Sequence, residues 1–220
     1  MGVLKTITDE YFGDSIRKED EIDISGLDVE IVSFTDKNGI EHRHGYRVKD
    51  DSPNKMVKTL KKLIERIIEK RGNECSLNDI DVSNQKKMCY ENKEDYDTYG
   101  VFYNSPFNGD ISGWDVSRVE NMELMFYGAK SFNQDISGWD VSSVKYMSAM
   151  FSGAESFNQP LDKWDVSNVE YMRSMFYHAK SFNQPLDNWK DKLSKVKNMD
   201  FMFEHTLLEK NNNLPDWYTK

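Results

Sequence analysis

The sequence has few cysteines and no long apolar run. Its two cysteines, Cys75 and Cys89, are too few for a disulfide framework among 220 residues, and free thiols are more typical of a reducing compartment. No stretch approaches the roughly 18 apolar residues of a membrane span. The first residues also lack the apolar core of a signal peptide. We therefore expect no membrane span and favour the cytoplasm, while the cell surface or a virion remains open.

Acidic residues outnumber basic ones, 38 to 29, and catalytic motifs are lacking. The formal net charge is −9, which argues against nucleic-acid binding because that function needs a basic surface. The sequence has no phosphate-binding loop, no nucleophile elbow and no Cys/His catalytic signature. We therefore predict that the protein is not an enzyme and holds no cofactor or metal. The aromatic content of 13% indicates that most of the chain folds.

A period of 25 residues dominates the second half of the chain. Tryptophan, Phe-Asn pairs, methionine, Met-Phe pairs and alanine all recur at this step. The tryptophans are Trp114, Trp139, Trp164 and Trp189, and the Phe-Asn pairs begin at Phe107, Phe132, Phe157 and Phe182. The methionines are Met122, Met147 and Met172, with Met-Phe pairs at Met125, Met150 and Met175. We predict that these side chains form the core and that stacked asparagines satisfy backbone groups at a corner.

The spacing inside one unit favours a strand followed by a helix. Trp139 and Val141 are two residues apart, so they should face the core while Asp140 faces outward. The apolar residues from Val144 to Ala154 then follow steps of three and four, which are typical of one helical face. One unit buries too little surface to fold alone, so the units must stack. The predicted fold is an α/β solenoid, a leucine-rich-repeat-like stack of short parallel strands and short helices.

The repeat resembles a known family. The string at 132–154, Phe-Asn-Gln-Asp-Ile-Ser-Gly-Trp-Asp-Val-Ser followed by the methionine positions, is similar to the 25-residue repeat of BspA-like leucine-rich-repeat surface proteins, including mycoplasma-type lipoproteins. This resemblance covers roughly Ser76 to Thr206. It implies a solenoid that binds proteins or host surfaces and has no active site.

The N-terminal segment differs from the repeats. Residues 29–34 and 40–48 flank a Lys37-Asn38-Gly39 turn, which predicts a β-hairpin. Ser52-Pro53 should begin an amphipathic helix that Gly72 ends. We predict an α+β unit at 1–73, the solenoid at 74–207 and a C-terminal tail or cap at 208–220. The other helix face is basic, and a solvated face is its simplest interpretation.

Several side chains are candidates for partner binding. Asp115, Asp140 and Asp165 should form an acidic column on the outer face, where each could bind a partner or cap a local turn. Positions that vary between the copies on the same face are further candidates: Ser112, Ser137, Asp162 and Asp187, with Gly113, Gly138, Lys163 and Asn188. His42 and His44 share one strand face, but the sequence offers no third metal ligand at a recognisable spacing.

These features favour a non-enzymatic module that binds a protein partner through the solenoid surface. The alternative is a structural or assembly component of a virus or cell envelope, in which the N-terminal unit docks and the solenoid acts as a spacer. Partner identity and oligomeric state do not follow from the sequence.

Overall fold

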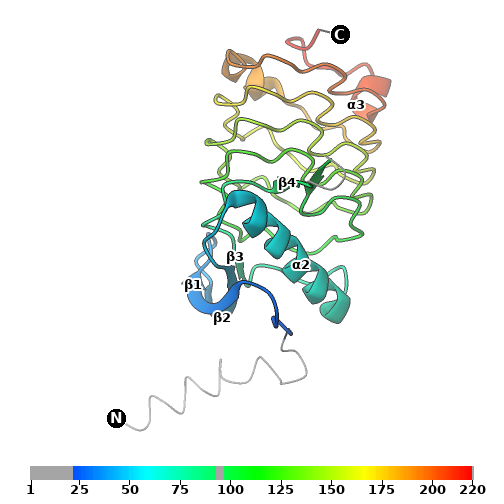
Figure 1. Ribbon diagram of the computed structural model, residues 1–220. Coiled ribbons are helices and arrows are strands. Elements are labelled where there is room, and N and C mark those ends of the chain that lie inside the picture. The colour runs from blue at the N-terminus through cyan, green and yellow to red at the C-terminus, as the bar shows by residue number, and fades with distance from the viewer. Residues whose placement is uncertain (1–21, 93–96, 220) are drawn as a thin grey trace.

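The computed structural model describes residues 22–92 and 97–219, and residues 1–21 of the predicted N-terminal unit lie outside the described residues (Figure 1). The N-terminal unit contains a mixed sheet. Strands β1 (Val29–Thr35) and β2 (Glu41–Val48) are antiparallel, and β3 (Ile80–Asp81) runs parallel to β2. The predicted hairpin is therefore confirmed, and the sheet takes its third strand from residues beyond 73.

Helix α2 (Pro53–Arg71) confirms the predicted amphipathic helix. Proline stands at its first turn, where the missing N–H has no helical partner, and Gly72 ends it at a φ of 88°. Its apolar stripe is buried. The buried residues are Met56, Val57, Thr59, Leu60, Leu63, Ile64 and Ile67. The helix packs on β4 (Cys89–Glu91), at the first of the stacked units.

The repeat region contains a large buried aromatic cluster and little regular structure, so the predicted strands and helices of each unit are wrong. Among the described residues of the repeats, the units are linked by isolated parallel bridges, which join Asn121 to Tyr146, Tyr146 to Tyr171 and Tyr171 to Asn198. These bridges fall inside the segment predicted as helix. The Trp-Asp-Val segment, predicted as strand, has no regular structure and lies between two turns.

A left-handed residue in each unit explains why the helix does not form. Leu124, Ala149, Ser174 and Phe201 occupy equivalent positions and have φ between 52° and 58°. A right-handed helix cannot pass through such a residue. The methionine spacing of three arises instead from a tight turn, as in the bond from the Met150 N–H to the Met147 carbonyl (3.2 Å).

Hydrogen bonds between units replace those of a helix. We call residues 121–128, 146–153, 171–178 and 198–205 the ladder segments. In each of the first three, alternate N–H groups donate to carbonyls of the next segment, as from Met147 to Tyr171 (2.8 Å) and from Phe151 to Met175 (2.9 Å). In the opposite direction, the Lys145 N–H donates to the Glu120 carbonyl (2.9 Å). Neighbouring units thus satisfy each other's backbone groups.

The predicted core columns are buried and stack on their own equivalents. The ring of Phe151 lies 5.4 Å from that of Phe126 and 5.6 Å from that of Phe176, with interplanar angles of 3° and 4°. Each indole N–H donates to a carbonyl of the preceding unit. Trp139 Nε1, for example, donates to the Ile111 carbonyl (3.2 Å). Flat offset stacking and a partnered indole N–H are the arrangements that buried aromatic rings prefer.

The asparagine column has the structural role predicted for it. Asn133 Oδ1 accepts from the N–H of Asn158 (2.9 Å) and from Nε2 of Gln159 (3.1 Å). The Asn133 N–H in turn donates to Asn108 Oδ1 (2.8 Å). One side-chain amide therefore replaces a backbone partner at the corner of each unit.

Both ends of the stack are atypical. At the front, β4 and β5 (Thr98–Gly100) form an inserted hairpin, and Phe102 then stacks on Phe126 at 5.2 Å. At the back, a 3-10 helix η1 (Asp187–Lys192) takes up the two extra residues after Trp189. Helix α3 (Leu207–Lys210) follows, and residues 207–219 pack on the last unit, where Trp217 Nε1 donates to the Leu186 carbonyl (3.2 Å).

Replacing Asn133 with Ala tests the asparagine column. The change removes the acceptor of the Asn158 N–H and one of the two acceptors of Gln159 Nε2, so we expect the free energy of unfolding to fall by about 1–3 kcal/mol. Urea denaturation monitored by tryptophan fluorescence measures the change. Asn213→Ala, at an exposed position, is the matched control and should shift stability by less than about 0.5 kcal/mol. Equal effects at both positions would contradict the role of the column.

Candidate functional site

The outer face of the ladder segments varies from one unit to the next. In each segment the side chains of the methionines and the phenylalanine point inward and are fully or nearly fully buried, apart from Met199 in the last. The side chains between them face outward and differ from copy to copy. The bridge position is Asn121, Tyr146, Tyr171 or Asn198, and the position two residues later is Glu123, Ser148, Arg173 or Asp200.

Aromatic rings and cations meet on this outer face. Tyr146 is 39% exposed and its ring stacks on that of Tyr171 at 5.6 Å. Lys197 Nζ lies 5.5 Å from the Tyr171 ring centre, and the Arg173 guanidinium lies 5.3 Å from the ring of Phe201, which is 43% exposed. Such pairs are favourable at partly exposed sites. The face therefore offers flat apolar area with charged rims.

The predicted acidic column is exposed, but its carboxylates are engaged locally. Oδ1 of Asp115, Asp140 and Asp165 each accepts the N–H of the serine two residues later, at 3.0–3.1 Å. Hydrogen bonds from the side chain and backbone of Ser167 lower the pKa of Asp165. Of the two interpretations that the sequence left open, the turn cap is the one that these contacts support.

The hairpin turn of the N-terminal unit contacts the candidates Ser112, Gly113 and Gly138 on the same predicted face. Asn38 Nδ2 donates to Ser112 Oγ (3.2 Å), and the Lys37 N–H donates to the Gly113 carbonyl (3.1 Å). Lys37 Nζ also donates to the carbonyl of Gly138. Burial lowers the pKa of Lys37, although the surrounding carboxylates oppose the shift. Ser112, Gly113 and Gly138 therefore hold the N-terminal unit against the stack.

The remaining residues of that face lie further along the stack. Asn188 Nδ2 donates to Asp162 Oδ2 (3.1 Å), while Lys163 and Asp187 are exposed. The Ser137 N–H donates to Asp135 Oδ1 (2.9 Å), so the Asp135 carboxylate caps a local turn. No sequence pattern predicts the hairpin contact, because it joins residues 74 to 101 positions apart.

The two strand histidines are not brought to a shared ligand. His42 Nε2 lies 3.1 Å from Asp36 Oδ2 and its ring stacks on Phe34 at 4.9 Å, whereas His44 is exposed. In the described ranges 22–92 and 97–219, no group of three or more His, Cys, Asp or Glu side chains is placed to hold a metal ion.

Several cations of the basic face of α2 form contacts within the molecule, although the face stays exposed or half-buried. Lys55 forms ion pairs with Asp28 (2.8 Å) and Asp51 (2.5 Å). Arg66 Nη1 donates to the carbonyl of Asp23 (2.6 Å), and Arg71 pairs with Asp79 (2.8 Å). These contacts fasten the helix to its own unit and leave little of it for an acidic partner.

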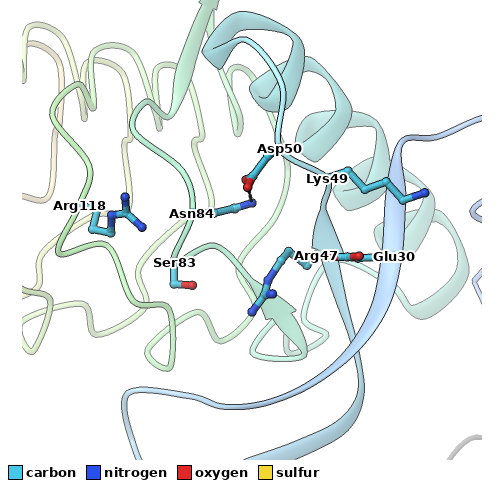
Figure 2. Close-up of a pocket in the computed structure, with 7 residues that line it drawn as sticks. All are labelled: Glu30, Arg47, Lys49, Asp50, Ser83, Asn84 and Arg118. Carbon is cyan, nitrogen blue, oxygen red and sulfur yellow. Dashed lines mark hydrogen bonds between the residues drawn. The ribbon is translucent and has the colours of Figure 1, made fainter.

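A shallow polar hollow lies between the N-terminal sheet and the first units (Figure 2). Glu30, Arg47, Lys49, Asp50, Ser83, Asn84 and Arg118 line it. Arg47 pairs with the buried Asp81, and Asn84 Nδ2 donates to Asp50 Oδ1 (3.0 Å). Figure 2 shows the Lys49 side chain directed away from Arg118. The charges are mixed, and no nucleophile with an adjacent base lies among them.

Burial suppresses the reactivity of both cysteines. It raises the pKa of the Cys89 thiol to about 12 and raises that of Cys75 as well. The thiolate is the reactive form, so neither side chain resembles an activated nucleophile.

The chain belongs to a family described as Mycoplasma protein of unknown function, DUF285, whose model matches residues 96–217. That match covers the inserted hairpin's second strand, the stacked units and most of the C-terminal tail. No curated protein and no solved structure matches the chain. Within the part of the chain that the structure describes, no helix is long and apolar enough to cross a membrane.

Alkylation rates test the environment of Cys89. At about pH 8 we expect iodoacetamide to modify Cys89 at least about 100-fold more slowly in the folded protein than in urea, as followed by mass spectrometry. The contribution of this thiol to stability should be full below pH 9.0 and fall as the pH rises toward about 12, because the unfolded chain loses the proton first. A Cys75→Ala background isolates the signal, and comparable rates in both states would contradict the burial.

Proposed function

We propose that this chain is a non-enzymatic protein-binding module and that the outer face of its ladder segments is the recognition surface. One observation carries the proposal: the buried positions of the segments repeat the same residue types, whereas the exposed positions between them vary. Repetition is what stacking requires of the core. Variation on a rigid, regular face is what recognition of a particular partner requires.

The chemistry of that face supports a protein as the partner. It includes the exposed Tyr146 and Arg173 and the half-buried Tyr171, and Tyr and Arg are the residue types that are enriched at the energetic centres of protein interfaces. Phe201 adds apolar area at one end. The polar hollow of Figure 2 and the buried thiols offer no comparable argument for catalysis.

We further propose that the stack is a solenoid of the leucine-rich-repeat type, related to the BspA-like repeats that the motif resembles. Three features support this: the 25-residue step, hydrogen bonds that join each unit to its neighbours, and membership of a Mycoplasma family. A surface or host-binding role would follow from that relationship.

The alternative role as an assembly component needs an N-terminal unit that is free to dock. The hairpin turn instead contacts Gly113 and Gly138, and the cations of α2 are largely paired within the molecule. These contacts favour recognition by the stack over docking by the N-terminal unit.

A block substitution tests the assignment of the face. A partner captured from the native source with the whole chain as bait is first identified by mass spectrometry. We expect Tyr146→Ala, Tyr171→Ala and Arg173→Ala together to weaken its binding by about 100-fold or more, because large exposed aromatic and Arg anchors dominate protein interfaces. Isothermal titration calorimetry measures the affinity.

The matched control replaces Asp162, Lys163, Asp187 and Asn188 with Ser, on the face first suggested by the sequence. This variant should bind within about threefold of the unmodified chain. The opposite result, with loss of binding only in the control variant, would transfer the recognition site to that face. Unchanged binding by both variants would remove the repeats from recognition.

A further inference from the structure

The last ladder segment ends the stack with unpaired backbone groups. In the three segments before it, the first two outward N–H donors reach the next unit: Met172 donates to the Asn198 carbonyl (2.9 Å) and Ser174 to the Asp200 carbonyl (2.8 Å). Their counterparts in the last segment are Met199 and Phe201. Over residues 22–92 and 97–219, neither N–H has an acceptor.

One carbonyl at the same edge is also unpaired. The carbonyls of Lys86, Glu120, Lys145 and Glu170 each accept an N–H from the following unit, at 2.8–2.9 Å. The next member of that series is the Lys197 carbonyl, and no donor reaches it from any described residue. The edge therefore presents one acceptor followed by two donors, in the order in which every earlier unit engages its neighbour.

Apolar side chains are uncovered at the same place. Val119, Val144 and Val169 are fully buried, as are the three preceding methionines of the column, but Val196 and Met199 are only partly buried. In the intact stack each valine and methionine is covered by its equivalent one unit later. The apolar surface above Val196 and Met199 thus lies directly beside the unpaired backbone edge.

The C-terminal tail closes the rest of this end. The Leu208 N–H donates to the Phe182 carbonyl (2.9 Å), and the ring of Tyr218 lies 5.0 Å from that of Phe203. The His205 N–H, the last donor of the segment, is satisfied by the Glu209 carboxylate (2.8 Å). The Phe203 N–H also lacks an acceptor among the described residues, but its side chain is 1% exposed and contacts the rings of Trp217 and Tyr218. The uncovered part of the edge therefore comprises residues 196–201.

We propose that this edge, Val196 to Phe201, binds a segment of another protein chain that adopts the ladder conformation and adds to the stack in parallel. The segment offers an N–H to the Lys197 carbonyl and two alternate carbonyls to Met199 and Phe201. It also places apolar side chains three residues apart over Val196 and Met199. This site is the end of the ladder and does not depend on the outer face proposed above.

A second copy of this chain is a poorer occupant. Head-to-tail addition would need the ladder edge at the front of the stack, but α2 packs on β4 there and Lys61 Nζ donates to the Val101 carbonyl (3.4 Å). Tail-to-tail pairing would run antiparallel, whereas every earlier contact of this edge is parallel. A short edge also buries far less than the roughly 1,000 Å² of a stable protein interface.

The chain itself supplies a probe. Residues 166–177 lie on the preceding unit through the bonds that the open edge lacks, with Glu170 N–H donating to Lys145 and the carbonyls of Tyr171 and Arg173 accepting. A synthetic peptide of this sequence should therefore fit on the last unit. The control peptide carries Val169→Asp and Met172→Asp, which removes the apolar pair and keeps the backbone.

Amide hydrogen exchange of the full chain, resolved by NMR, is the readout. Without peptide, we expect the N–H groups of Met199 and Phe201 to exchange at least about tenfold faster than those of Met172 and Ser174. Saturating peptide should slow Met199 and Phe201 by about tenfold or more, and the control peptide should leave them unchanged.

Two protein variants complete the test. Met199→Asp and Val196→Asp should each abolish the protection by the peptide. The control Ile31→Asp, at an exposed apolar position in β1, should retain it. Near-UV circular dichroism verifies that each variant is folded. Slow exchange of Met199 and Phe201 in the free chain, or no protection by the peptide, would overturn the proposal. If the chain sediments with twice its mass and the same amides are then protected, the edge binds a second copy instead.

Discussion

Contact between equivalent residues of neighbouring units is the interaction on which the rest of the structure depends. The units between residues 101 and 186 contain no helix or strand, and their alternate ladder N–H groups find acceptors in the next unit. Its phenylalanine and tryptophan rings are covered by rings of the same kind. The ordering entropy of a unit is therefore offset only where another unit is already in place.

The two ends of the stack each lack one neighbouring unit, and they are covered in different ways. At the front, the α+β unit packs α2 on β4 and contacts the stack through the hairpin turn at Lys37. At the back, a short tail places Trp217 where the next indole would lie and supplies Glu209 for one backbone donor. The front is closed by a folded unit, and the back is closed only in part.

Much of the fold could be predicted because repetition reveals the core directly. The Trp, Phe and Met columns, the role of asparagine, the hairpin and the helix from Pro53 are all as predicted. The helix within each unit was wrong because a spacing of three and four residues also fits a tight turn. The left-handed residue in that turn is Leu124, Ala149 or Ser174, so no glycine or asparagine marks it.

The candidate site could be predicted less well, for a related reason. An alternation of exposed and buried residues around Tyr146-Met147-Ser148 was a readable sign of an extended ladder segment, but the helical spacing obscured it. The occupation of Ser112 and Gly138 by the hairpin turn could not be predicted, since it depends on how two separately folded parts meet.

The asparagine column also limits how such a chain can change in length. Each asparagine side chain joins one copy to the next at an identical point, so excision or duplication of 25 residues would leave every junction with its proper partners. A deletion of any other size would misplace the asparagine amide, the indole and the ladder segment at once. The exception is a connection such as the one around η1, which already holds two extra residues. Recombination between copies could thus alter the reach of the surface in whole units without redesigning the interior.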